Sequence, residues 1–257
     1  MRILSLLALG AVGPLASLAA DCTREFLQES ADSLLAAQAA GDPSLLQPVP
    51  EAFVYHENAQ EATFETGILA TALGIDHSRH SLDTTQCATY TEFISATGAT
   101  PYVIGVQMFF EEGAIAKVDA LVTTTGDWLF NATGTLHWAS QEDWGPIPED
   151  RRDSREVIQA AADAYCDIFS DKDTVVPWGY PCARLEGGMY TGTGGPDDRC
   201  DVGIPSGVEL VDRRYVIDET VGAVSVFLSF SGLPDSHEFR VEEGKLRYVH
   251  TITVFRT

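Results

Sequence analysis

The chain has 257 residues, with 38 acidic and 16 basic side chains, for a formal net charge of −22. A charge this negative repels phosphate backbones and anionic lipid, so it excludes nucleic acid and anionic membranes as natural partners. An apolar content of 45% is typical of a globular chain and not of a disordered one.

The first twenty residues predict a secretory signal peptide. Arg2 supplies the positive start, residues 3–18 the apolar run, and residues 17–20 a cleavage region of small side chains. The run is too short to span a membrane, and no second long apolar run follows it. We therefore expect a secreted protein with no membrane span. In that setting the sequon at Asn131 predicts N-glycosylation.

Two stretches of the chain repeat at one offset. Residues 23–32 (TREFLQESAD) match residues 154–163 (SREVIQAAAD), 131 positions further on, and the triplet EEG at 111–113 returns at 242–244. Two unrelated stretches with the same offset indicate a tandem duplication. We predict a unit at 21–124, a packed bridge rich in Trp and Pro at 125–152, and a second unit at 153–257.

The first unit begins with an amphipathic pattern that predicts a helix over residues 23–40, ended by Gly41. A short strand at 52–56 and a small helix at 61–73 follow. Residues 75–83 are expected to form a polar loop. Three long strands are then predicted at 84–97, 102–111 and 114–124.

The second unit is expected to repeat this order. Its helix covers 153–170, and its strands are predicted near 183–190, 207–218, 223–230, 237–242 and 245–254. Residues 231–236 would interrupt the third long strand. A Gly-rich loop runs from 191 to 199, but it lacks the flanking residues of a phosphate or dinucleotide motif.

Cysteine usage fits the secreted setting, where most cysteines form disulfides. Cys166 falls on the apolar face of the second long helix, so we expect it to be a buried free thiol. The other four allow three connectivities. We favour Cys22–Cys87 and Cys182–Cys200, because each pair then lies within one unit.

The order of a long helix, a short strand, a small helix and several long strands resembles the NTF2-like, or SnoaL-like, superfamily. The whole chain also resembles a family of uncharacterised fungal secreted proteins, at residues 75–77, 83–88, 126–133, 181–188 and the last hairpin. The superfamily resemblance implies an α+β fold: two cones in tandem, each a curved antiparallel sheet wrapped around a long helix. It also implies an internal pseudo-dimer, which makes a monomer the expected assembly.

The last hairpin carries the strongest site candidates. A turn at residues 243–244 would place His237 opposite His250 and Phe239 opposite Tyr248. Strand alternation then puts these four side chains on one largely apolar face. Such a face suits a ligand pocket with a few polar groups. We predict His250, His237 and Tyr248 as catalytic residues; the alternative is a hydrogen-bonded core pair beside a structural tyrosine.

Other polar residues are weaker candidates for a functional site. The duplication aligns Asp119 with His250 and Lys117 with Tyr248, so the first unit could hold a pocket of different chemistry or a plain ion pair. Asp76 and His77 could form an oriented base or simply belong to a polar loop. The spacing of His77 and His80 does not make a metal motif, and we predict no metal.

Arg184 and Glu186 alternate along one strand. They could recognise a substrate carboxylate or form a buried ion pair.

Taken together, these candidate residues lead to three hypotheses for the function. The first is a cofactor-free lyase, isomerase or cyclase acting on a small apolar metabolite. The second is a non-catalytic binder of a small hydrophobic ligand, and the third is an extracellular interaction protein whose cones are filled by side chains.

Overall fold

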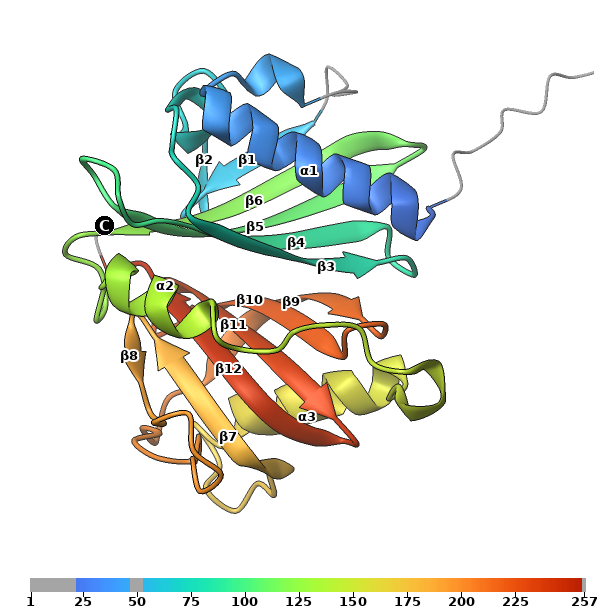
Figure 1. Ribbon diagram of the computed structural model, residues 1–257, viewed down its shortest axis with the longest axis vertical. Coiled ribbons are helices and arrows are strands. Elements are labelled where there is room, and N and C mark those ends of the chain that lie inside the picture. The colour runs from blue at the N-terminus through green and yellow to red at the C-terminus, as the bar shows by residue number, and fades with distance from the viewer. Residues whose placement is uncertain (1–21, 47–52, 256–257) are drawn as a thin grey trace, which may run out of the picture.

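The computed structural model describes residues 22–46 and 53–255, and it contains two similar halves built around six-stranded sheets (Figure 1). The predicted signal peptide lies outside the described residues. We call residues 22–124 the first half, 153–255 the second half, and the segment between them the bridge. The tandem duplication expected from the repeat is confirmed at this level.

In the first half, α1 (Arg24–Ala40) packs on a sheet of order β2-β1-β6-β5-β4-β3. Its strands are β1 (Val54–Glu57), β2 (Gln60–Glu61), β3 (His77–Asp83), β4 (Ala88–Ser95), β5 (Tyr102–Glu111) and β6 (Ala114–Thr124). Short 3-10 turns lie at Pro43–Leu45 (η1) and Ile68–Ala70 (η2).

The second half repeats this arrangement, with α3 (Arg155–Asp167) on a sheet of order β8-β7-β12-β11-β10-β9. Its strands are β7 (Trp178–Glu186), β8 (Met189–Tyr190), β9 (Leu210–Asp218), β10 (Ala223–Phe230), β11 (Leu233–Glu242) and β12 (Lys245–Thr253). The bridge contains α2 (Ala132–Ala139) and the 3-10 turn η3 (Glu149–Arg151).

Local sequence explains where α1 begins and ends. The Thr23 hydroxyl accepts a hydrogen bond from the Phe26 backbone N–H at 3.2 Å, as a helix N-cap does. At the other end, Gly41 adopts a φ of 63°, and a Cβ there would lie 2.5 Å from the Ala72 backbone nitrogen. Glycine is therefore required at this end of the helix.

Several expectations about elements are wrong. Each sheet is mixed and not antiparallel, because β1 runs parallel to β6 and β7 parallel to β12. The expected helix at 61–73 is replaced by β2 and the short turn η2. Residues 77–83 form β3 and not a loop, and β11 begins at Leu233, inside the segment expected to interrupt it. The helix α2 was not expected.

A β-bulge occurs at the same place in both halves. In the second half, Arg240 pairs with Tyr248 but Val241 pairs with Leu246, so Arg247 is an extra residue. In the first half, Ala116 is the corresponding extra residue. One extra residue exchanges the two faces of the strand beyond it. This bulge decides which side chains of β12 face the helix and which face the other half.

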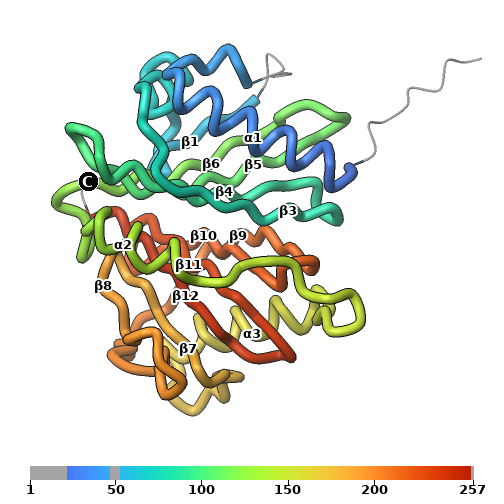
Figure 2. Tube along the Cα trace, in the orientation of Figure 1, coloured from blue at the N-terminus to red at the C-terminus, as the bar shows by residue number. Residues whose placement is uncertain are grey.

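The two sheets face each other, with α1 and α3 on their outer sides (Figures 1 and 2). An apolar cluster lies between the sheets and includes Tyr90 and Phe227, whose ring centroids are 6.0 Å apart. Cys22–Cys87 and Cys182–Cys200 are bonded, and Cys166 is free and buried, as expected. No helix in residues 22–46 or 53–255 is long and apolar enough to cross a membrane.

Candidate functional site

A cavity of about 310 Å³ lies in the second half, between α3 and the strands β7, β11 and β12. Aromatic and aliphatic side chains form most of its wall: Trp128, Tyr165, Phe169, Phe230, Leu233 and Phe255. Four ionisable side chains also reach it: Arg184, Glu186, Asp235 and His237. We call this space the α3 cavity. An apolar cavity with a few convergent polar groups is the usual form of a small-molecule site.

His237 and Asp235 form the first polar pair of the α3 cavity. His237 Nδ1 lies 2.8 Å from Asp235 Oδ2, and both side chains are almost completely buried. The two atoms are close without being aligned as a hydrogen bond. The Thr253 hydroxyl donates to Asp235 Oδ1 at 2.6 Å and so holds the carboxyl group. A carboxylate beside Nδ1 favours the tautomer that leaves Nε2 free to accept a proton.

Arg184 and Glu186 form the second polar pair. Arg184 Nε lies 3.2 Å from Glu186 Oε2, and the guanidinium also donates to the Cys200 carbonyl at 3.4 Å. The Trp128 indole donates to Glu186 Oε1 at 2.7 Å, which brings the bridge over the cavity. The expected pairing of Arg184 with Glu186 is therefore present, and it lies in a cavity wall.

The two halves differ at the positions of these polar groups. Strand pairing aligns His237 with Val106 and Asp235 with Ile104, and both first-half residues are fully buried core side chains. The same comparison aligns Arg184 with Tyr55. The second half thus has Asp235, His237 and Arg184 where the first half has two aliphatic side chains and a tyrosine, while Glu186 has a counterpart in Glu57.

His250 and Tyr248 do not share a face with His237, and this part of the sequence prediction is wrong. His237 pairs with Thr251, and His250 pairs with Glu238. Because of the bulge at Arg247, His250 points between the two sheets and Tyr248 lines a separate polar cavity. Phe239 is fully buried and stacks on His237, so it supports the imidazole from the core.

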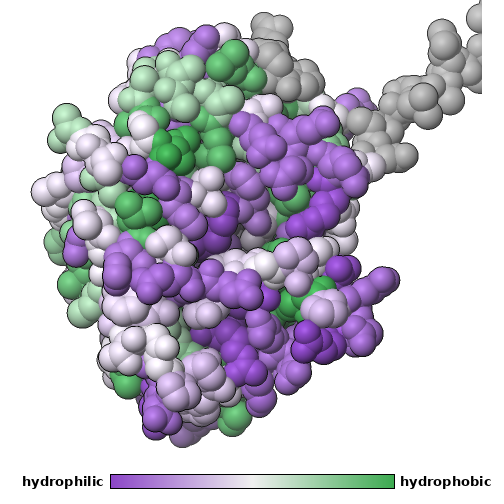
Figure 3. Space-filling view, in the orientation of Figure 1, coloured by the Kyte–Doolittle hydropathy of each residue, from purple (hydrophilic) through white to green (hydrophobic). Residues whose placement is uncertain are grey.

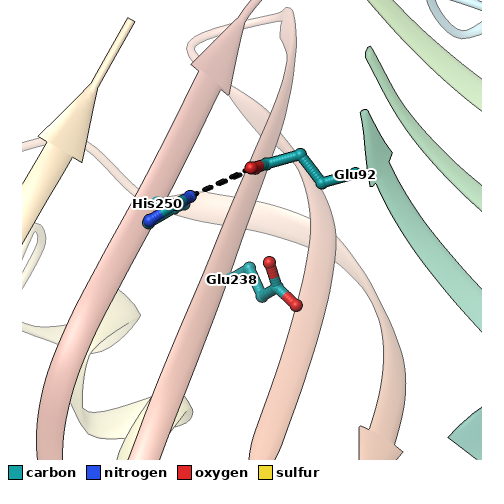
Figure 4. Close-up of side chains that lie close together, drawn as sticks. All are labelled: Glu92, Glu238 and His250. Atoms are coloured by element: carbon teal, nitrogen blue, oxygen red, sulfur yellow. Dashed lines mark hydrogen bonds and ion pairs between the residues drawn. The ribbon is translucent and has the colours of Figure 1, made fainter. Parts of the chain in front are cut away.

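Between the sheets, His250 lies near carboxylates from three other segments, and Figure 4 shows two of them, Glu92 and Glu238. Its Nδ1 lies 3.1 Å from Glu92 of β4, and its Nε2 lies 2.6 Å from Glu142 of the bridge. Glu238 of β11 completes the group. The Arg79 guanidinium contacts Glu92 at 2.7 Å, His250 Nδ1 at 2.8 Å, and Glu238. We call these five residues the inter-sheet cluster.

Charge pairing shifts the pKa values within the inter-sheet cluster. Burial and Arg79 oppose protonation of His250, but the carboxylates outweigh them and raise its pKa to about 9. Burial alone would raise the pKa of Glu92, but Arg79 and His250 lower it to about 2. For Glu238, burial prevails and raises the pKa. Carboxylates beside both ring nitrogens favour the protonated form of His250, as in an internal ion pair.

Glu92, Glu238 and His250 offer ligand atoms that lie within 4.8 Å of one another, a spacing that could hold a metal ion. Arg79 already contacts all three of these side chains. Its guanidinium supplies the positive charge that a metal would bring, and it would repel a cation placed beside it. The cluster therefore fits an internal ion network better than a metal site.

The remaining predicted residues lie apart from the α3 cavity. Asp76 accepts hydrogen bonds from the backbone N–H groups of residues 96 and 97, so it caps a turn. His77 is half-buried at the start of β3. Asp119 contacts Lys117 at 2.7 Å and also His56 and Arg214, which makes it an ion-pair centre between the halves. Asn131 is exposed and caps α2.

Sequence reasoning missed three contributors to the α3 cavity: Asp235, Tyr165 and Trp128. Asp235 was assigned to an interrupting loop, although its spacing of two from His237 would have placed both on one strand face. Tyr165 lies on the buried face of α3, where burial raises the pKa of its phenol. Trp128 could be assigned to the bridge but not to a particular neighbour.

A family model for a domain of unknown function (DUF8021) matches residues 151–253, which span the second half from η3 to β12. Neither the curated proteins nor the solved structures contain a significant match. The matched segment contains all the ionisable residues of the α3 cavity. This similarity gives no activity for the chain.

Proposed function

We propose that the second half is a cofactor-free enzyme that moves a proton on a small apolar molecule bound in the α3 cavity. The observation that carries the proposal is the pair of His237 and Asp235 in an otherwise apolar cavity. The helix-and-sheet enclosure is similar in outline to the NTF2-like, or SnoaL-like, cone. The two disulfides support secretion, because such bonds persist in oxidising compartments.

The proposed roles follow from the two polar pairs. His237 takes a proton from the bound molecule through Nε2, and Asp235 stabilises the imidazolium that forms. Arg184 stabilises negative charge that develops on a carbonyl oxygen of the substrate, as a guanidinium does in a buried site. Proton removal next to a carbonyl is the first step of many lyase, isomerase and cyclase reactions.

The charge balance of the cavity favours a neutral substrate. Arg184 is paired with Glu186, and Asp235 faces His237, so neither pair leaves an uncompensated positive charge for an anionic ligand. A free carboxylate would also have to lose its hydration in an apolar cavity. We therefore propose an apolar ketone or aldehyde with an acidic neighbouring C–H group, in place of the carboxylate considered from sequence.

The test begins with displacement of the neutral fluorophore 1-aminoanthracene by a panel of apolar ketones. Deuterium exchange at the carbon beside the carbonyl is then followed by NMR in heavy water. We expect His237→Gln to bind the same ketones but to exchange about 100-fold more slowly, the usual contribution of a general base. His137→Gln replaces an exposed histidine of α2 and should behave as wild type.

Unchanged exchange in His237→Gln would refute the catalytic proposal. If wild type binds ketones but catalyses no exchange, and His237→Gln binds equally well, the second half is a binder of apolar ligands. If the fluorophore and the ketones fail to bind wild type, the cavity is only a packing feature of the core. This result would support the hypothesis of an extracellular interaction protein.

A further inference from the structure

A second cavity, of about 560 Å³, opens where the bridge meets β7, β8 and the beginning of β12. It is separate from the α3 cavity and has no lining residue in common with it. We call it the bridge cavity. Residues of the bridge, of the Gly-rich loop and of the last hairpin all contribute to its wall.

Four aromatic side chains line the bridge cavity: Trp138, Tyr180, Tyr190 and Tyr248. Trp138 and Tyr190 are stacked in parallel, with ring centroids 4.2 Å apart and an interplanar angle of 5°. Tyr248 stacks on Trp144 at 5.7 Å. Tyr180 is 52% exposed at the rim, and the Arg199 guanidinium already lies over its ring, 5.5 Å from the centroid. Aromatic faces of this kind attract cations through the negative charge of their π systems.

The charged residues in the wall are predominantly acidic. Four carboxylates line the cavity, from Glu142, Asp143, Asp198 and Glu242, against the single guanidinium of Arg247. Arg247 is itself held by the Tyr180 carbonyl at 3.1 Å and lies 4.0 Å from Glu242. The whole chain is also strongly acidic. Three of the four carboxylates already have partners: Glu142 pairs with His250, Glu242 with Arg240, and Asp198 with backbone N–H groups of the Gly-rich loop. The exposed Asp143 and the overall negative charge therefore favour a positively charged occupant.

Glu142 gives a more specific indication. Its side chain is only 2% exposed, and its Oε2 accepts hydrogen bonds from His250 and Trp144. Its Oε1 is buried as well, and the Tyr190 phenol is hydrogen-bonded to the same carboxylate. Burial and this carboxylate raise the pKa of the nearby Tyr190 phenol. An ionised carboxylate has about four lone-pair sites, and His250, Trp144 and Tyr190 occupy three of them. An N–H group of a ligand would use the remaining site.

We propose that the bridge cavity binds a small organic cation that carries N–H groups, such as a primary alkylammonium. The aromatic rings contact its methylene groups and its charge, Glu142 accepts a hydrogen bond from its ammonium group, and Asp143 adds attraction at the rim. A bare metal ion would not use the aromatic wall, and an anion would meet four carboxylates.

The test is isothermal titration calorimetry of the full-length mature protein at low salt, with cadaverine as the cationic probe. Cellobiose serves as a neutral probe and acetate as an anionic one. We expect cadaverine to bind, with an affinity that falls as salt is added because the attraction is screened. Binding of cellobiose without cadaverine, or binding of none of the probes, would overturn the proposal.

Two variants locate the site. Asp143→Asn and Tyr180→Ala each change an exposed side chain, so folding should be preserved. Each should weaken cadaverine binding roughly two- to fivefold, the size of one screened ion pair or one exposed cation–π contact. Glu149→Gln removes the same charge from an exposed site outside the cavity and should leave the affinity unchanged. Equal affinity in all three variants would show that cadaverine binds through general charge attraction.

Discussion

At the scale of single residues, the two histidines of the last hairpin have opposite surroundings. His237 faces an apolar cavity with one carboxylate beside it. His250 lies between Glu92 and Glu142, with Arg79 in contact as well. The first environment leaves the imidazole next to a cavity, and the second surrounds it with charged side chains. Similar positions on neighbouring strands therefore have different surroundings, which is why we propose a catalytic role for His237 alone.

The raised pKa of His250 predicts a loss of stability in alkali. Its pKa rises from 6.5 to about 9 on folding. The stabilisation is fully present below pH 6.5 and disappears as the pH rises through 9. Its size is on the order of 3 kcal/mol from the pKa difference. Urea unfolding at pH 6 to 10 should show this decline in wild type.

The comparison variant for this measurement is His250→Gln. It should be less stable near neutral pH, and its stability should change much less between pH 6.5 and 9. His137→Gln should keep the wild-type decline, because His137 is exposed on α2. A wild-type profile in His250→Gln would mean that another group causes the alkaline transition.

At the scale of elements, the sequence predicted most of the strands but not the faces of the last one. Counting outward from the turn at residues 243–244 treats the hairpin as regular. The bulge at Arg247 adds one residue, so the side chains of Tyr248 and His250 lie on the opposite face of the sheet from the one that was predicted. Nothing in the local sequence marks this residue as extra, since a bulge here requires neither glycine nor proline.

We predict that the Cys182–Cys200 disulfide holds part of the wall of the α3 cavity in place. Arg184 donates to the Cys200 carbonyl, and Gly203 and Pro205 of the same loop line the cavity. Cys182–Cys200 closes an interval of 18 residues. Replacing both cysteines by alanine should cost about 3 kcal/mol of unfolding free energy.

The same double variant should also weaken 1-aminoanthracene binding, because the loop that forms part of the cavity wall loses its attachment. Denaturant unfolding and fluorescence titration measure the two effects separately. Removal of Cys22–Cys87 is the control: it should destabilise the first half while leaving the fluorophore affinity unchanged. Equal affinity in both double variants would show that the disulfide does not shape the cavity.

At the scale of the whole molecule, the repeated motif at the start of each long helix joins the halves. Arg24 of the first half contacts Asp218 of the second at 2.8 Å, and Arg155 contacts Asp83 at 2.7 Å. Each aspartate also accepts a backbone N–H from the other half, at Leu82 or Ile217. The duplicated arginine thus forms two reciprocal clamps across the interface.

We predict that removing Arg155 lowers the free energy of unfolding more than removing Arg24 does. Arg155→Ala leaves Asp83, which is fully buried, without its bidentate partner. Loss of one member of a buried pair typically costs about 3–5 kcal/mol. Arg24→Ala should cost less, because Arg24 makes one contact and is 34% exposed. Denaturant unfolding measures both, with the exposed Arg151→Ala as a neutral control.

If Arg155→Ala were no less stable than Arg151→Ala, the clamp would contribute nothing to the association of the halves.

The visible surface around the junction of the halves is mainly hydrophilic, with apolar side chains gathered over parts of the first half (Figure 3). The apolar contacts between the sheets are buried. We therefore expect that each half needs the intact interface to stay folded.

The sequence by itself determined the duplication, the two long helices and most strand positions, and it favoured the two disulfides that form. The elements follow from local periodicity and the duplication from an internal repeat, and the disulfides were favoured because each pair lies within one unit. Only the tertiary structure decided that Asp235 accompanies His237 and that His250 belongs to the inter-sheet cluster. Those contacts depend on a one-residue bulge and on residues far apart in the chain, such as Glu92 and His250, which meet only when the two sheets pack together.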